Sequence, residues 1–303
     1  MSEIGDLMIE RTTAPAAKAI ATARLQRRYS PVIWLSLLCL DAPLVALMWQ
    51  WLFARTYDVK LDFSSRAALF LTAWLIYLVD RWVDTIELPS EAPMSLRHRF
   101  CKMRVRRWVS GLAAIFFLNG WVALRGLNFS TLLLGGTVLL LCLGYLVTNH
   151  SLGGNWRIFP MKELVIGILF AAGTVLVLLP KLSAFPASLL VAFTIFACLC
   201  FLNCVSIAAW ERPLDEAQGK TSLIIRWPGF ERFLPVVGLF LVIIATSFAF
   251  RDQSPLFFCI ASSVLLLIAL DLLRPVISRD ERTALADLVL LTPLVIFLWD
   301  FAR

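Results

Sequence analysis

The chain has 303 residues, of which 60% are hydrophobic, and it carries a formal net charge of +7. Its mean hydropathy of +0.81 is far above that of a soluble domain, so the composition excludes a soluble globular protein. We expect an all-α membrane protein whose positive charge lies in loops facing an anionic membrane surface, and no nucleic-acid partner.

The first 30 residues differ from the rest of the chain. They are polar and alanine-rich, and they carry both acidic and basic side chains. We expect a cytoplasmic N-terminal segment that forms a short helix at the membrane surface. Residues 31–303 are expected to form a single transmembrane domain, because apolar runs fill this region too evenly to leave room for a soluble domain.

Runs of about 17–25 apolar residues are long enough to cross a bilayer as helices. Such runs recur along the chain and predict a bundle of nine transmembrane helices. The expected spans are Val32–Phe53, Ala67–Val83, Trp108–Leu124, Thr131–Thr148, Glu163–Pro180, Ala187–Ala209, Leu234–Phe250, Pro255–Leu273 and Ala284–Phe301.

Charge asymmetry predicts the orientation of these spans, because Lys and Arg concentrate on the cytoplasmic side of membrane proteins. Most of the 28 Lys and Arg residues fall in the N-terminal segment or after the even-numbered spans. We therefore expect the N-terminus in the cytoplasm, the C-terminus on the other side, and a multi-pass protein of the bacterial cytoplasmic membrane. The other side keeps only Arg55, Lys60, Arg66, Arg125, Lys181, Arg251 and Arg303.

Two pairs of acidic residues stand where apolar spans end. Asp80 and Asp84 close the second predicted span, and Glu211 and Asp215 follow the sixth. A spacing of four places both members of a pair on one helix face, where like charges repel. A Mg²⁺ ion shared with a phosphate ligand would relieve that repulsion. The orientation places both pairs on one membrane face, so we expect a single metal site. Without a cation, some of the acids should be protonated or held apart.

Basic residues near the acid pairs are candidates for binding phosphate. Arg97 and Arg99 follow the first pair. Lys162 opens the fifth span, and Lys220 follows the second acid pair. Guanidinium and ammonium groups bind phosphate oxygens well. The alternative for each residue is an ordinary interfacial cation that faces lipid headgroups.

Asn203 lies about two helical turns before Glu211. It would add a neutral oxygen to the metal site only if the pocket reaches that deep. Ordinary packing is the alternative interpretation.

The sequences around both acid pairs resemble the acidic motifs of the UbiA-type intramembrane prenyltransferases. IYLVDRWVD is similar to that family's NDxxDxxxD motif, with Ile76 and Tyr77 in place of the Asn and the first Asp. ERPLDEAQGKTS is similar to its second DxxxD motif, with Glu211 in place of the first Asp. The resemblance covers roughly residue 31 to the C-terminus in topology.

Two further segments extend the resemblance. A Tyr-x-x-x-Lys element of the family matches Tyr145, while Asn149 stands in place of its lysine. FPMKELVIG is similar to the segment that enters the family's fifth helix, and it contains Lys162.

The resemblance implies a nine-helix fold and Mg²⁺-dependent transfer of a prenyl group from a prenyl diphosphate to a small-molecule acceptor that the sequence does not identify. Aromatic side chains such as Trp74, Tyr77 and Tyr145 would stabilise the allylic cation through their ring faces. On this interpretation Asp80, Asp84, Glu211 and Asp215 are the catalytic metal ligands, and Arg97, Arg99, Tyr145, Lys162, Asn203 and Lys220 bind substrate.

Two other classes of function stay open. A transporter or channel would place ionisable groups near the middle of the bilayer. Asp41 in the first span is the one clear candidate for that role, and Asp271 and Asp300 lie close to span ends. A non-catalytic relative would keep the fold and bind a lipid or a partner without turnover, since one fold supports many functions.

Overall fold

The computed structural model describes residues 30–88, 92–151 and 161–302, and every regular element in these ranges is a helix. The predicted N-terminal surface helix lies outside them. The helices are α2 (Pro31–Leu37), α3 (Asp41–Thr56), α4 (Phe63–Glu87), α5 (Leu96–Met103), α6 (Val105–Gly126), α7 (Phe129–Ser151), α8 (Lys162–Val175), α9 (Ala187–Ala217), α10 (Leu223–Arg226), α11 (Leu234–Asp252), α12 (Pro255–Leu272), α13 (Arg279–Leu288) and α14 (Pro293–Phe301), with short 3₁₀ helices η1 (Leu176–Lys181) and η2 (Phe230–Phe233).

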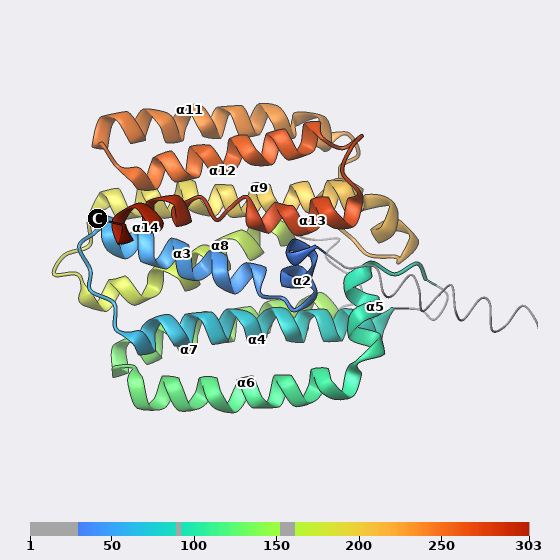
Figure 1. Cartoon of the computed structure of the whole chain (residues 1–303), viewed down its shortest axis with the longest axis horizontal. Coiled ribbons are helices and arrows are strands. Elements are labelled where there is room, and N and C mark those ends of the chain that lie inside the picture. Colours follow the sequence, from blue (N-terminus) through green and yellow to red (C-terminus); the bar gives the residue numbers. More distant parts are fainter. Residues whose placement is uncertain (1–29, 89–91, 152–160, 303) are drawn as a thin grey trace, which may run out of the picture.

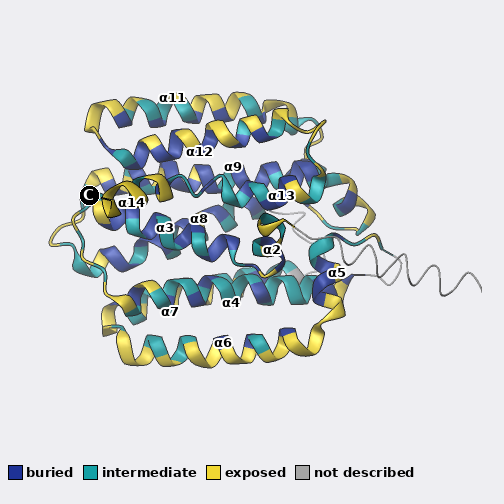
Figure 2. Ribbon diagram, in the orientation of Figure 1, coloured by how far each residue is buried: buried dark blue, intermediate teal, exposed yellow. Residues whose placement is uncertain are grey.

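Seven helical segments of the described chain are long and apolar enough to cross a membrane, and two bent helix pairs raise the number to as many as nine. The spanning segments include α4, α6, α7 and α9. Many large apolar side chains are exposed, among them Phe116, Phe117 and Leu124 of α6. Figure 2 shows exposed residues along much of α6. An apolar exterior of this kind suits lipid rather than water. The protein is therefore a polytopic helical membrane protein.

The first predicted span is not one continuous helix. The axes of α2 and α3 meet at 94°, and Cys39 between them has a positive φ of 54°. A positive φ ends regular helix geometry because the side chain then crowds the backbone. Trp74 of α4 donates its indole N–H to the carbonyl of Leu38 at 2.9 Å. A backbone carbonyl at the break therefore keeps a hydrogen-bond donor, which it needs where the surroundings are lipid.

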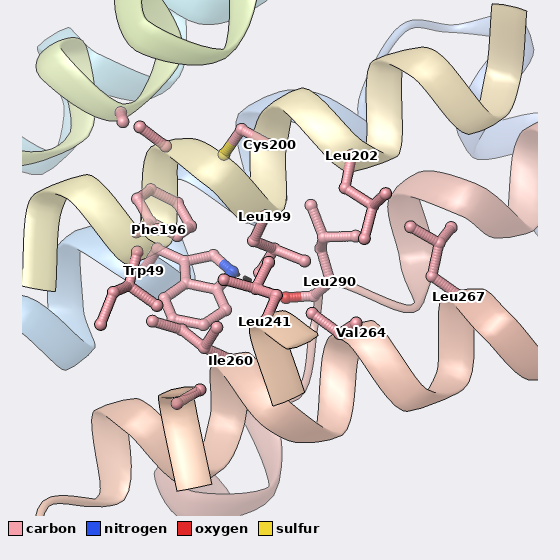
Figure 3. Packing of buried hydrophobic residues seen from close by; sticks show 14 of the residues in the cluster. Trp49, Phe196, Leu199, Cys200, Leu202, Leu241, Ile260, Val264, Leu267 and Leu290 are labelled. Carbon is pink, nitrogen blue, oxygen red and sulfur yellow. Dashed lines mark hydrogen bonds between the residues drawn. The ribbon is translucent and has the colours of Figure 1, made fainter. Parts of the chain in front are cut away.

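The last predicted span is broken in the same way. Helices α13 and α14 meet at 51°, and Pro293, which has no N–H to donate, opens α14. Trp49 of α3 donates its indole N–H to the carbonyl of Leu290 at 2.8 Å (Figure 3). Each of these two predicted spans is therefore a bent helix pair that can still count as one span. The bend itself was not predicted, because hydropathy does not register a turn that a tryptophan stabilises from another helix.

Most of the long helices run side by side, and α5 lies across the ends of α4 and α6 (Figure 1). The larger core is built around α9, whose buried residues pack with α3, α8, α11 and α12. A smaller core joins α2, α4, α5 and α6. Helices α8 and α9 approach closely at Gly167, where an added Cβ would lie 2.8 Å from the backbone nitrogen of Phe201. Small residues allow this close packing in membrane helices.

Helices α4 and α9 end on the same side of the bundle, next to α5 (Figure 1). We call this side the α5 end. The end of the chain at α14 lies at the opposite end of the bundle. The fold therefore places both acid pairs at one end, which is the arrangement that a joint site requires.

Candidate active site at the α5 end

The first acid pair lies on the last turns of α4. Lys220 Nζ donates to Asp84 Oδ2 at 2.6 Å, and His98 Nε2 of α5 lies 3.6 Å from the same oxygen. Arg81, between the two acids in sequence, interacts electrostatically with Asp80, Asp84 and Glu211. The first acid pair is therefore surrounded by basic side chains from three segments.

The second acid pair lies near the end of α9. Arg97 Nη2 of α5 donates to Glu211 Oε1 at 2.6 Å. The exposed fractions of the two side chains are 17% and 13%, so water screens this ion pair poorly. Asp215 interacts electrostatically with Glu211, with Asp84 and with the lysines at positions 162 and 220. The two pairs thus share one charged region.

The turn after α9 brings Lys220 to the site. Gly219 has a φ of +69°, a backbone conformation that glycine adopts without steric cost. The N–H of Lys220 then donates to the carbonyl of Asp215 at 2.9 Å, which closes the helix end. Gln218 Nε2 donates to the carbonyl of Pro93 at 2.7 Å and holds this turn against the segment before α5. The lysine is therefore directed back to α4 by local backbone geometry.

Helix α5 is positioned by its cap and by its apolar face. Ser95 Oγ accepts from the N–H of His98 at 3.4 Å, which caps the first turn. Phe100 and Cys101 are buried in the smaller core. Burial lowers the pKa of His98 and the cations Arg81, Lys220 and Arg97 lower it further, whereas Asp84 raises it. The net effect lowers the pKa of His98, so burial disfavours its charged form, and Arg97 of the same helix supplies positive charge to the site.

The other predicted site residues are distributed unevenly. Tyr145 of α7 interacts electrostatically with Asp80, Asp84 and Glu163, so it lies near the acids. Arg99 is exposed. It is two residues from Arg97, which turns it about 200° around the helix. Lys162 opens α8 and acts on Asp215, as noted above.

Asn203 is placed away from the carboxylates of its own helix. Its Nδ2 donates to Asp287 Oδ1 of α13 at 2.9 Å. This hydrogen bond favours a role for Asn203 in packing α9 against α13 over a role as a metal ligand. Asn203 and Asp287 line a small pocket together with residues of α3, α4 and α8.

Sequence reasoning missed several charged residues of this region. Arg81 is not among the predicted site residues, although its place between Asp80 and Asp84 in the first motif is a usable signal. Glu163 is buried, and its Oε1 accepts from the N–H of Leu223 at 3.1 Å, which ties α8 to α10. Asp287 carried no signal, because it pairs with Asn203 only through the tertiary fold.

The three acidic residues considered for a transport function each have their own hydrogen-bond or ion-pair partners. Asp41 begins α3 at the first helix break, and its Oδ1 accepts from the N–H of Ala42 at 3.0 Å. Asp271 accepts from Trp210 Nε1 at 2.6 Å and pairs with Arg274. Asp300 pairs with Arg55 near the C-terminal end of the chain. Two of the three therefore form ion pairs near helix ends.

The donor chemistry of the acid pairs suits Mg²⁺, which prefers carboxylate and phosphate oxygens. Within residues 30–88, 92–151 and 161–302, no three His, Cys, Asp or Glu side chains form a ready metal-binding group. Mg²⁺ is commonly held by one or two carboxylates, with phosphate and water completing its shell. The residues present therefore fit the ion together with a diphosphate rather than alone.

Comparison with known proteins gives one line of support for the fold. No family model matches the chain, and no curated protein matches it. The solved structure described as an apo structure of a UbiA homolog from Aeropyrum pernix K1 is similar, with a TM-score of 0.56 at 13% sequence identity. The similarity covers 86% of this chain and 98% of that one. The protein thus has the fold of a UbiA homolog.

Proposed function

We propose that the protein catalyses Mg²⁺-dependent transfer of a prenyl group from a prenyl diphosphate to an acceptor within the membrane. The observation that carries this proposal is the meeting of two acid pairs from distant helices around Arg97 and Lys220, at one end of a bundle with the fold of a UbiA homolog. The expected cytoplasmic orientation would give this site access to a water-soluble diphosphate group.

The carboxylates Asp80, Asp84, Glu211 and Asp215 would hold Mg²⁺, which supplies positive charge against the diphosphate when bound. Arg97 and Lys220 already pair with Glu211 and Asp84 in the described structure. Our sequence expectation was that acids without a metal ion would be protonated or held apart. The protein's own cations offer a third arrangement, in which they neutralise two of the four acids.

A diphosphate entering the site would compete with the carboxylates for these two cations. Arg97 and Lys220 would then donate to diphosphate oxygens and stabilise the negative charge that develops as the allylic C–O bond breaks. Apolar helices around the site would exclude water, which would otherwise trap the allylic cation. Tyr145 interacts electrostatically with Asp80 and Asp84, and its ring face would favour positive charge near the reacting carbon of the prenyl chain.

The test measures the thermal unfolding midpoint of the full-length protein in detergent with Mg²⁺, with geranyl diphosphate, and with both. A rise is expected only when both are added. Asp84→Asn and Asp215→Asn should each abolish the joint rise. Glu216→Gln is the matched control, because Glu216 neighbours Asp215 but is exposed and pairs with Arg212.

Equal binding of the diphosphate in excess chelator would contradict the proposal, as would normal binding by both Asn variants. Mass spectrometry of lipids after incubation adds a second readout. A joint thermal rise without any prenylated product would favour the non-catalytic alternative, in which Ile76 and Tyr77 have replaced residues needed for turnover.

A further inference from the structure

A small pocket lies deeper in the bundle than the acid pairs. It is formed between α3, α4, α8, α9 and α13, and its volume of about 20 Å³ is room for a single water molecule. Most of its wall is apolar, with side chains such as Val45, Ile166 and Phe170. Its polar wall residues include Tyr77, Asn203 and Asp287. Asn203 lies about two helical turns before Glu211 on α9.

The hydrogen bond between Asn203 and Asp287 determines which atom of the Asn203 amide group has no partner in the described part of the protein. A carboxylate accepts hydrogen bonds, so the amide nitrogen of Asn203 faces Asp287 Oδ1, at 2.9 Å. The other amide atom, Asn203 Oδ1, is buried and has no hydrogen-bond partner among the described residues. The whole residue is only 5% exposed. Buried acceptors are rarely left unpaired, so Asn203 Oδ1 requires a hydrogen-bond donor, which either a water molecule or a ligand group can supply.

We propose that this pocket binds the hydrogen-bond-donating head group of the acceptor, either a hydroxyl or an amine. The space is of the order of one water molecule, and two of the residues that line it, Asn203 and Asp287, carry oxygens that accept hydrogen bonds. A carboxylate or phosphate head group would bring negative charge against the Asp287 carboxylate, and as an anion it offers Asn203 Oδ1 no hydrogen-bond donor. The inference rests on the proposed prenyl transfer, because an acceptor is a substrate of this protein only if that reaction takes place.

The placement also separates the two substrates. The diphosphate would lie at the α5 end among the basic side chains, and the acceptor's head group would lie about two helical turns deeper. Asp287 lines the pocket there, and Asp41 interacts electrostatically with Asp287 and Tyr77. Arg81 and Arg97 act electrostatically on Asp287 as well. They lie toward the diphosphate side, so an anionic acceptor would be drawn to them and away from the pocket.

The test uses four probes with the same tail: 4-butylphenol, 4-butylaniline, 4-butylbenzoate and butylbenzene. Apparent affinities are measured by thermal unfolding of the full-length protein in detergent. The phenol and the aniline should bind at least about tenfold more tightly than the other two, and their ratio tells which donor the site prefers. Butylbenzene corrects for partition into detergent.

Two variants and a control locate the binding. Asn203→Leu should weaken binding of the phenol and the aniline about tenfold, the loss expected for one buried hydrogen bond. Asp287→Asn is isosteric and serves if the leucine variant does not fold; it should reduce the preference over the benzoate. Asn119→Leu is the matched control, because Asn119 of α6 also has a buried Oδ1 without a partner among the described residues, but it bonds Thr72 and does not line the pocket.

Binding of Mg²⁺ with geranyl diphosphate is measured on the same preparations. If the diphosphate binds and the four probes bind alike, or if Asn203→Leu has no more effect than Asn119→Leu, the pocket holds only a structural water and this inference is wrong. If no diphosphate binds with Mg²⁺, the proposed function itself fails, and the assignment of the pocket to an acceptor fails with it.

Discussion

Arg97 donates a hydrogen bond of 2.6 Å to Glu211, and so joins α5 to the end of α9 across 114 positions of sequence. Both side chains are mostly shielded from water. Removing one partner of such a pair leaves a poorly solvated charge, which costs far more than an exposed ion pair contributes. The pair therefore serves both the stability of the α5 end and the charge balance of the candidate site.

Arg97→Ala is expected to lower the free energy of unfolding by about 3 kcal/mol, because it removes the cation that is hydrogen-bonded to the poorly solvated Glu211. Arg99→Ala, in the same helix but exposed, should change it by less than about 0.5 kcal/mol. Denaturant unfolding in detergent measures both. Adding Glu211→Gln to Arg97→Ala should recover part of the loss. Equal effects of the two single variants would show that the pair is solvated.

Lys162→Ala is expected to weaken binding of geranyl diphosphate in Mg²⁺ about tenfold, because a charge-assisted hydrogen bond would be lost. Lys162 acts electrostatically on Asp215, which places it at the site. Lys102→Ala is the control, since Lys102 is an exposed cation near the end of α5. Isothermal titration of the diphosphate reports the ratio. Small and equal effects would return Lys162 to the role of an interfacial cation.

Trp49→Phe keeps an aromatic ring in the core but removes the donor to the carbonyl of Leu290. Trp49 is fully buried and stacks near Phe196, with ring centroids 4.5 Å apart (Figure 3). An unpaired buried carbonyl costs about 1–3 kcal/mol, so the unfolding midpoint should fall clearly. Trp227→Phe changes an exposed tryptophan and should have little effect. If Trp49→Phe left the unfolding midpoint unchanged, water would have to replace the indole as the donor to the Leu290 carbonyl.

Asp62 links α4 to η1 at the end of the bundle opposite α5. Partial burial raises the pKa of Asp62, but hydrogen bonds from Lys181 and Ser65, with the charge of Lys181, lower it to about 2 from 3.8. A carboxyl whose pKa is depressed by folding stabilises the fold above its unfolded value, and this contribution is lost as pH falls through the folded value.

Asp62→Asn should therefore destabilise the protein at pH 6 and lose this effect between about pH 4 and pH 2. Asparagine still caps the helix, so the variant isolates the charge. The side chain of Asp62 is half exposed, and solvent screening limits the expected difference to about 1 kcal/mol or less. Unfolding curves of both proteins across this pH range provide the measurement. A constant difference down to pH 2 would contradict the assignment.

The orientation in the membrane is testable with reporter fusions after Leu88 and after Arg303. We expect them on opposite sides, because α4 ends at the α5 end and the C-terminal helix ends at the other (Figure 1). The charge asymmetry further predicts that the fusion after Leu88 lies in the cytoplasm. Finding both reporters on one side would contradict the predicted topology.

The sequence determined the spans and the position of the acids along them, because both depend on local properties. Apolar length decides whether a helix crosses a bilayer, and a spacing of four decides that Asp80 and Asp84 share a face. The same reasoning applies to Glu211 and Asp215. Charge asymmetry then predicted that the two pairs lie at one end, and the fold places them there.

The tertiary structure decided the partners. Arg97 and Arg99 were equivalent candidates in sequence, and only the packing of Phe100 and Cys101 in the smaller core turns Arg97 toward Glu211 and leaves Arg99 exposed. Asn203 meets Asp287 across 84 positions of sequence. Such pairs depend on how helices are rotated and packed against one another, which is set by side chains along their whole length. No local pattern encodes that rotation, and for this reason the deep pocket is visible only in the fold.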